Sequence, residues 1–281
     1  MIEIQSYGDR LDKGSYEVHS RFNKTVNFIS ANTIVSIVNE EIGAGPLNIV
    51  IRGSDLKDVR SLIIDDKGFL LNDLRFDFDD AHRFDSRIEF VDIDIDKFKS
   101  NLYIFENCLL QYSSAMSLAF LLDAKRKKNF RTFFEKEFVG RFDAGVEKIF
   151  STELIEGVTM IKGAGFGFTP SGDDFLYGLL IALNIATGLF KLDLTECVNR
   201  IYDTARGNNP ISNAFLRCAK DGFLFERFKK LVHSILYFGK KEIFECNQAL
   251  LSVGETSGAD MGIGFLMGLK SCQLSAFSRQ L

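Results

Sequence analysis

A glycine-rich segment at residues 163–178 carries the clearest chemical signal in the sequence. It reads GAGFGFTPSGDDFLYG, with five glycines in sixteen residues. Glycine permits positive φ angles and lets backbone N–H groups come close to a ligand. Such a loop leading into a helix is a typical anion site, because several N–H groups converge there with the positive end of the helix dipole. Gly165, Gly167 and Gly172 are therefore candidate substrate-binding positions.

The polar residues of this segment indicate where the helix begins. Pro170 favours an extended backbone at Thr169. Ser171 then fits as the N-cap, with Asp174 reaching back from the third helical position. The hydroxyls of Thr169 and Ser171 could donate hydrogen bonds to a bound anion. Gly188 fits as the residue that ends the helix.

Two carboxylates in the first turn of this helix complicate an anion site. Asp173 and Asp174 would repel an anion unless they point elsewhere as caps or hold a cation such as Mg²⁺ that bridges them to the ligand. A stable cap before a buried helix would explain the same residues without any ligand. The segment is not a Walker loop, which ends in G-K-[ST], and no strand-then-helix unit makes it a Rossmann fingerprint.

The spacing S-G-x-D-x-x-x-G-x-L-x-x-L that starts at Ser171 recurs at Ser257. Asp260 stands in the second copy where Asp174 stands in the first. Small residues four apart in both copies allow close approach of helix backbones. We therefore expect the two helices to pack together, with their N-termini toward one pocket. The residues before the two serines differ, so coincidence stays an alternative and no duplicated domain is inferred.

A second polar segment, VHSRFNKTVNF, covers residues 18–28. His19, Ser20 and Arg21 could orient or bind a carboxylate. A lone histidine beside a serine is more often structural than catalytic, and no Ser/His/Asp order can be established from one sequence.

The remaining candidates are isolated along the chain. Arg206 is a candidate anion partner, although a solvated arginine in the last turn of a helix is the commoner role. His82 and His233 have no partners at ligand spacing, so we expect no zinc site. The basic run at residues 125–128 is interpreted as a solvated helix end that is too short to bind nucleic acid.

The elements that position these segments differ between the two parts of the chain. Residues 1–96 are rich in short β-branched runs, and Asp65–Gly68 has the sequence of a hairpin turn. The DIDID alternation at residues 92–96 favours a strand with one wet face and one dry face. Predicted strands cover Thr33–Val38, Leu47–Arg52, Ser61–Ile64, Phe69–Phe78 and Arg87–Asp96.

From residue 97 the apolar residues follow the spacing of one helix face. Predicted helices cover 97–122, 128–138, 141–153, 171–187, 194–206, 210–221, 223–238, 240–252 and 258–272. Strands followed by a run of helices predict an α+β protein. We expect a β-rich N-terminal region, 1–96, packed on a mainly helical domain, 97–281, that carries the glycine-rich segment.

Composition narrows the class of protein. The chain has 281 residues, of which 46% are apolar and 26% charged, as in ordinary globular domains. The net charge of −4 argues against a general nucleic-acid-binding surface. The most apolar stretch, 175–190, is shorter than the roughly 20 residues of a membrane span. Five scattered cysteines and no signal pattern at the start favour free thiols in a cytoplasmic protein.

Three segments resemble one bacterial family. GFGFTPSGDDFL at residues 165–176 is similar to its signature G-x-G-L-T-P-S-G-D-D-F-L, with Phe168 in place of the usual Leu. VHSRF and VNF within residues 18–28 resemble its early element, V-H-S-x-F…x-N-L, and SGAD at 257–260 resembles its late element, S-G-x-D. This family, AllH, was long a domain of unknown function and is associated with a subunit of oxamate carbamoyltransferase in allantoin breakdown.

The resemblance implies a subunit that moves a carbamoyl group between carbamoyl phosphate and oxamate, with phosphorolysis of oxalurate as the direction of purine catabolism. Both substrates are small anions, which agrees with an anion site at the glycine-rich loop. His19, Asp173 and Asp174 would be catalytic. The substrate-binding residues would be Ser20, Asn27, Gly165, Gly167, Thr169, Ser171, Gly172, Arg206, Ser257 and Asp260.

The resemblance also implies other carbamoyltransferase subunits as partners, and the chain could form a homo-oligomer. No cofactor is implied beyond the Mg²⁺ considered above. A competing hypothesis is a non-catalytic anion-binding or scaffold subunit, in which the glycine motifs serve helix packing. A metabolite-binding regulator ranks last, because no DNA-binding element is visible.

Overall fold

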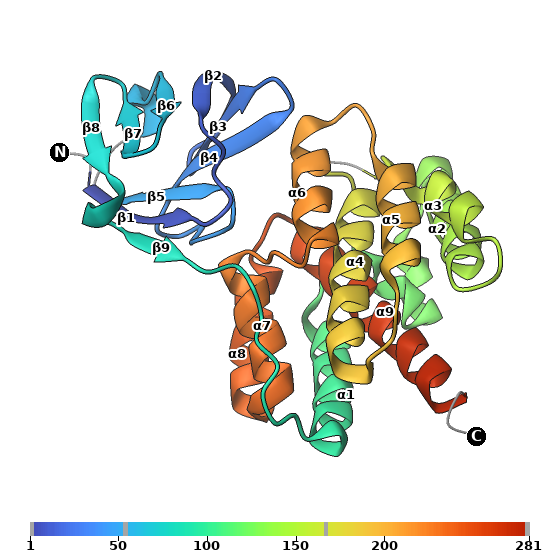
Figure 1. Ribbon diagram of the computed structural model, residues 1–281. Helices are drawn as coiled ribbons and strands as arrows, with labels where there is room; N and C mark the ends of the chain where they lie inside the picture. The colour runs from blue at the N-terminus through green and yellow to red at the C-terminus, as the bar shows by residue number, and fades with distance from the viewer. Residues whose placement is uncertain (1–2, 53–55, 166–167, 279–281) are drawn as a thin grey trace. The chain divides into compact units, whose positions relative to one another are not determined.

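The computed structural model describes residues 3–52, 56–165 and 168–278, with side chains up to residue 273 (Figure 1). The chain forms two compact units, residues 1–87 with 223–229, and residues 88–222 with 230–281. This division falls earlier than residue 96, where the sequence places it. Phe223–Lys229 joins the first unit because the Leu224 and Glu226 amides donate to Ser86 and Ala44 carbonyls, both at 2.9 Å.

The first unit is built on a sheet of nine described strands, in the order β8-β7-β6-β2-β3-β4-β5-β1-β9. Neighbours pair antiparallel, except for the parallel pairs β4–β5 and β1–β9. The bounds are β1 Glu3–Gly8, β2 Gly14–Arg21, β3 Thr25–Ser30, β4 Thr33–Asn39, β5 Asn48–Arg52, β6 Leu62–Ile64, β7 Gly68–Leu71, β8 Leu74–Asp77 and β9 His82–Phe84, with short 3₁₀ helices η1 Leu56–Asp58 and η2 Phe78–Asp80.

The hairpin prediction at Asp65–Gly68 is confirmed. Asp65 Oδ1 accepts from the amides of Lys67 and Gly68, and β6 pairs antiparallel with β7. The single strand predicted for Phe69–Phe78 is wrong, because Asn72, at a φ of 54°, reverses the chain between β7 and β8. The Asn72 side chain secures this turn by accepting from the amides of Arg60 and Ser61.

The strand predicted at Arg87–Asp96 is also wrong. Most of this segment is irregular, and helix α1 (Ile95–Tyr112) begins inside it. Asp94 is the N-cap, with Oδ1 accepting from the amides of Asp96 and Lys97 at 3.0 Å each. A short carboxylate binds nearby backbone amides readily, and here this local bonding prevails over the alternating pattern.

The second unit is mainly helical. Its elements after α1 are η3 Leu118–Leu121, η4 Ala124–Asn129, α2 Phe133–Ile149, α3 Leu154–Ile161, α4 Ser171–Phe190, α5 Thr195–Ala205, α6 Pro210–Lys220, α7 Glu226–Tyr237, whose first residues belong to the first unit, α8 Lys240–Leu251 and α9 Ser257–Ser278. The helices predicted at 128–138 and 141–153 are one helix, α2. A capping box between Thr132 and Glu135 fixes its start, and no breaker follows.

Helix α4 lies at the centre of the helical unit (Figure 1). Its length and hydropathy would suit a membrane span, but 72% of that window is buried inside the protein. An all-round apolar helix of this kind is a core helix. The Ser171 N-cap prediction is wrong, since Pro170 takes that position. The helix also continues past Gly188, and Lys191 adopts the left-handed conformation after its end.

Helices α4 and α9 pack against each other, as the repeated spacing predicts. A Cβ on Gly178 would lie 1.9 Å from the Met261 carbonyl oxygen, and one on Gly264 would lie 2.0 Å from that of Phe175. Each glycine therefore lets a backbone carbonyl of the other helix approach where no side chain fits. The two contacts are reciprocal, because Phe175 precedes Gly178 and Met261 precedes Gly264 by three residues.

We expect Gly178→Ala or Gly264→Ala to lower the free energy of unfolding by about 3 kcal/mol, since the added methyl group would push the helices apart. The matched control is Gly140→Ala on α2, where a Cβ meets nothing within 4 Å. This control should stabilise the protein by about 0.5–1 kcal/mol through helix propensity alone. Urea unfolding measures the free energy of unfolding of all three variants. Equal effects at the three positions would contradict the proposed backbone contact.

Candidate functional site

The first turns of α4 and α9 bring four motif residues together. The Ser257 hydroxyl of α9 hydrogen-bonds the Asp174 carboxyl of α4, and the Ser171 hydroxyl of α4 faces the Asp260 carboxyl of α9. Each S-G-x-D motif thus supplies a serine to the aspartate of the other. Thr169 Oγ1 lies 3.2 Å from Asp174 Oδ2 and 3.4 Å from Ser257 Oγ. We call these five residues the crossed Ser–Asp cluster.

Asp260 is completely buried. Its Oδ1 accepts from the Leu118 amide at 2.7 Å, whereas Oδ2 has no hydrogen-bond partner of standard geometry. Burial raises the pKa of Asp260 to about 7, against the lowering effects of the Leu118 amide and of the Ser171 and Thr256 hydroxyls. The carboxyl therefore exchanges its proton near neutral pH.

Asp174 is similarly buried, at 2% exposure. Burial raises its pKa well above the usual range, and the nearby charges of Asp260 and Asp173 raise it further. Hydrogen bonds from Ser257 and Thr169 lower it only in part. Burial therefore disfavours the ionised form of Asp174 in the folded protein.

Asp173 and Gly165 fix the loop that leads into α4. Asp173 Oδ1 accepts from the Gly163 amide at 2.8 Å. Gly165 has a φ of 119°, and a Cβ there would lie 2.6 Å from the Ser171 nitrogen. Glycine is therefore needed at this position for both backbone conformation and space. Gly167, also a sequence candidate, lies outside the described residues.

Carbonyl oxygens already occupy most of the amides at the start of α4. The Gly172 amide donates to Ala164 O at 2.9 Å, and the amides of Asp173 and Asp174 donate to Pro170 O. Within the described residues, the Ser171 amide has no carbonyl acceptor. The helix start therefore leaves fewer donors for an anion than the sequence suggests.

The early polar segment forms a separate constellation in the first unit. The pairing of β2 with β3 is irregular between Val18 and Ser20, which places His19 at the irregularity. Such bulges re-aim side chains and are frequent beside active sites. His19 Nδ1 lies 3.2 Å from Ser20 Oγ, and Asn27 Nδ2 donates to Ser20 Oγ at 3.0 Å. The buried Ser36 hydroxyl donates to Asn27 Oδ1 at 2.7 Å.

The two arginine candidates have different surroundings. The Arg21 guanidinium donates to the carbonyls of Leu56 and Val59 at 2.6 and 2.7 Å, so it anchors a neighbouring loop. Arg206 follows the last residue of α5, 3.9 Å from Asp203 and over the Tyr202 ring. Within the described chain, no hydrogen bond or ion pair joins Arg206 to the crossed Ser–Asp cluster.

The described part of the chain also shows how the cysteines and the possible metal ligands are placed. There, no group of three or more His, Cys, Asp or Glu side chains is arranged to hold a metal ion. The five cysteines are free thiols, as predicted. Burial raises the pKa of Cys108, Cys197, Cys246 and Cys272, the last to about 11, so these four are not activated nucleophiles.

Two family models match this chain. The model of the AllH family N-terminal domain matches residues 3–85, and the model described as oxamate carbamoyltransferase subunit AllH matches residues 161–269. The chain belongs to the AllH family. The first match contains the His19–Ser20–Asn27 constellation, and the second contains the whole crossed Ser–Asp cluster. No curated protein and no solved structure matches the chain.

Two residues of these hydrogen-bonded groups, Ser36 and Thr256, were not among the candidates from the sequence. Ser36 is the one polar residue in the apolar run IVSIV of β4, and that position was a usable signal. Thr256 faces Asp260 from the residue before Ser257, as Thr169 faces Asp174 from two residues before Ser171. This one-residue difference conceals the correspondence in the sequence.

Asp260 should make stability depend on pH. The unfolded carboxyl loses its proton above pH 3.8, whereas the folded one keeps it to about 7, so the free energy of unfolding should fall as pH rises between these values. Asp260→Asn keeps the Oδ1 acceptor and removes this dependence. The stability difference between wild type and variant should change by about 2–3 kcal/mol from pH 5 to pH 8.

Urea unfolding at several pH values checks this, with Asp193→Asn as a control of opposite sign. Hydrogen bonds from Thr195 lower the pKa of Asp193 from 3.8, so its contribution is lost only in acid. Parallel pH profiles for wild type and Asp260→Asn between pH 5 and pH 8 would contradict the titration of Asp260.

Proposed function

We propose that this chain takes part in carbamoyl transfer between carbamoyl phosphate and oxamate, as one subunit of a multi-subunit enzyme of allantoin breakdown. The match of residues 161–269 to the oxamate carbamoyltransferase subunit model carries this proposal. In the catabolic direction, hydrogen phosphate attacks the carbamoyl carbon of oxalurate and the bond to the oxamate nitrogen breaks. That nitrogen takes up the proton that the phosphate loses, and carbamoyl phosphate and oxamate leave. Both substrates and both products are anions.

The proposed anion site lies at the loop before α4. The Ser171 amide, the Thr169 hydroxyl and the positive end of the α4 dipole would bind a phosphate or carboxylate group. The raised pKa of Asp174 supports this assignment, because burial disfavours the negative charge that would repel an anion. The same donors would stabilise negative charge that develops at the tetrahedral carbamoyl carbon.

The remaining candidates have positioning or proton-transfer roles. Asp173 would hold the loop through the Gly163 amide, which is 2.8 Å from its Oδ1. His19 would carry a proton or orient a substrate, with Ser20 and Asn27 holding its surroundings through the hydrogen bonds of β2 and β3. Asp260 and Ser257 would fix the serine and aspartate of the opposite helix.

Thr169→Val and Asp173→Asn should each lower kcat/KM of the assembled enzyme for phosphorolysis of oxalurate by at least about 100-fold, because the first removes a proposed anion donor and the second weakens the bond that positions the loop. The assay measures carbamoyl phosphate formed with the partner subunits present. Thr159→Ala on the exposed side of α3 is the control and should leave the rate unchanged. Wild-type rates for both site variants in a folded complex would show that the assignment is wrong.

A non-catalytic anion-binding or scaffold subunit is the second candidate. The occupied amides of Gly172, Asp173 and Asp174 favour it, because their donors already serve the loop and the helix. The crossed Ser–Asp cluster would then join α4 to α9, and the active site would lie on a partner. This subunit would support assembly without contributing a reacting group.

Thermal unfolding of the full chain separates the two candidates. A ligand that binds only the folded state raises the melting temperature. Under the first candidate, phosphate, oxamate or carbamoyl phosphate raises it, and Thr169→Val reduces that rise. No change with any of the three anions, together with tight binding of partner subunits, would favour the scaffold.

A further inference from the structure

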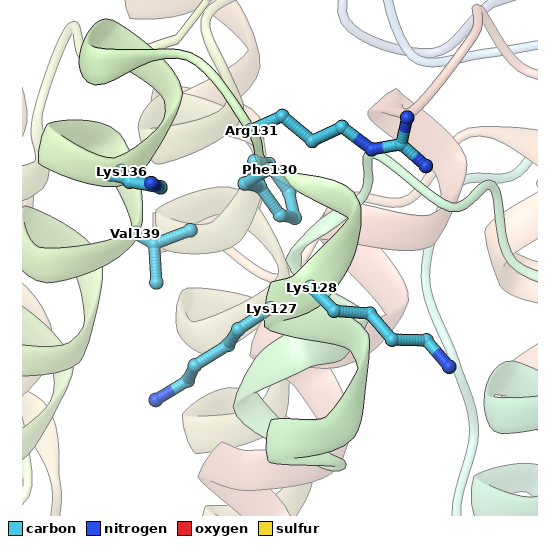
Figure 2. A pocket seen from close by; sticks show the side chains of 6 residues that line it. All are labelled: Lys127, Lys128, Phe130, Arg131, Lys136 and Val139. Atoms are coloured by element: carbon cyan, nitrogen blue, oxygen red, sulfur yellow. The ribbon is translucent and has the colours of Figure 1, made fainter.

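A cationic pocket of about 370 Å³ lies between η4 and the start of α2 (Figure 2). Four of its six lining residues carry a positive charge. Figure 2 shows Lys127, Lys136 and Val139 on one side of the Phe130 ring, and Lys128 and Arg131 on the other. The lining residues are Lys127, Lys128, Phe130, Arg131, Lys136 and Val139.

The backbone under this pocket is held in place by a side chain of the same basic run. The Arg126 guanidinium donates to the carbonyls of Leu110, Ser113 and Ser114 at 2.8–2.9 Å. The prediction that residues 125–128 are simply a solvated helix end is therefore wrong for Arg126. Asn129 adds a hydrogen bond to the Ala115 carbonyl. The segment that presents Lys127 and Lys128 is consequently preorganised.

Packed phenylalanine rings form the floor of the pocket. Phe130 is buried and stacks on Phe138 at a ring distance of 6.0 Å, with Phe120 edge-on at 5.2 Å. Phe142 continues this cluster behind Phe138. A partner side chain that enters the pocket would therefore meet a buried aromatic surface with cations on both sides.

Two of these cations lack an acidic partner within the described residues. Lys127 pairs with Asp143 at 2.6 Å, and the charge of Arg131 interacts with that of Glu135, but no ion pair is found there for Lys128 or Lys136. The nearby carboxylate of Glu135 is engaged by the backbone amides of Arg131 and Thr132. The cluster is thus a local excess of positive charge on a chain whose net charge is −4.

Two exposed phenylalanines adjoin the cations. Phe133 and Phe134 are 71% and 76% exposed and contact each other edge-on at 5.9 Å. Phe133 lies three residues before Lys136 and so shares a helix face with it. Bare aromatic rings of this size are costly in water, and together with arginine they are enriched where proteins bind each other.

We propose that this pocket and the Phe133–Phe134 pair dock an acidic segment of a partner protein that also carries large apolar side chains. The carboxylates would pair with Lys128, Arg131 and Lys136, and the apolar side chains would cover the exposed rings. Charge complementarity selects an acidic occupant. A small anion would leave both rings in water, and a flat lipid surface would not fill a pocket. This docking is independent of carbamoyl transfer.

The probe is a fluorescein-labelled synthetic peptide of alternating glutamate and leucine, titrated with the full chain and followed by fluorescence anisotropy. We expect saturable binding that weakens with added salt. Arg131→Glu combined with Lys136→Glu should weaken it by at least about tenfold. Phe133→Ser combined with Phe134→Ser should also weaken it by at least about tenfold, since aromatic anchors carry much of such binding.

Lys240→Glu combined with Lys241→Glu, on exposed residues at the start of α8, is the matched control and should bind the peptide like wild type. A version of the peptide with glutamine in place of glutamate should not bind. Four outcomes would overturn the proposal. The first is that the phenylalanine variant binds the peptide as tightly as wild type, and the second is that inorganic tripolyphosphate competes as well as the peptide. The third is that the same residues bind phosphatidylserine vesicles more tightly than the peptide. The fourth is that sedimentation velocity shows self-association of the chain, which the arginine–lysine variant abolishes.

Discussion

The contact between the backbones of α4 and α9 is the constraint on which the helical unit depends. At Gly178 and at Gly264, a backbone carbonyl of the other helix comes so close that no side chain would fit. Because the contact is reciprocal, it also fixes the first turns of the two helices relative to each other. This packing places Ser171 beside Asp260 and Ser257 beside Asp174.

This packing determines the charge of the cluster as well as its geometry. Carboxyls in an exposed first turn would be ionised and would stabilise the helix through its dipole. Here the close approach of α9 buries Asp174 and Asp260, and loss of hydration raises the pKa of both. Both carboxyls therefore keep their protons to higher pH than an exposed aspartate would.

The sequence predicted the features that depend on local spacing. The repeated S-G-x-D segments indicated two packed helices, and the strands β4, β5 and β6 and the Asp65 turn were recognisable. Predictions from the sequence were wrong where contacts with other segments determine the local structure. Ser171 has the sequence of an N-cap but bonds across to the other helix, and the Asp-Ile alternation at 92–96 became a cap for α1. The link between Ser36 and Asn27 depends on strand register, which the sequence alone does not specify.

The energetics of these features argue for roles beyond folding. An apolar crossing of α4 and α9 would avoid the cost of burying two carboxyls, and Asp260 keeps an Oδ2 without a standard hydrogen bond. Phe133 and Phe134 are exposed to water beside a cluster of cations. Folding requires neither the exposure of these rings nor the repulsion between the cations. Perturbed carboxyls gather at sites that act on ligands, and exposed aromatic–cation surfaces gather where proteins bind. Both features are therefore expensive for a fold that needed only stability, and both support the proposals made for them.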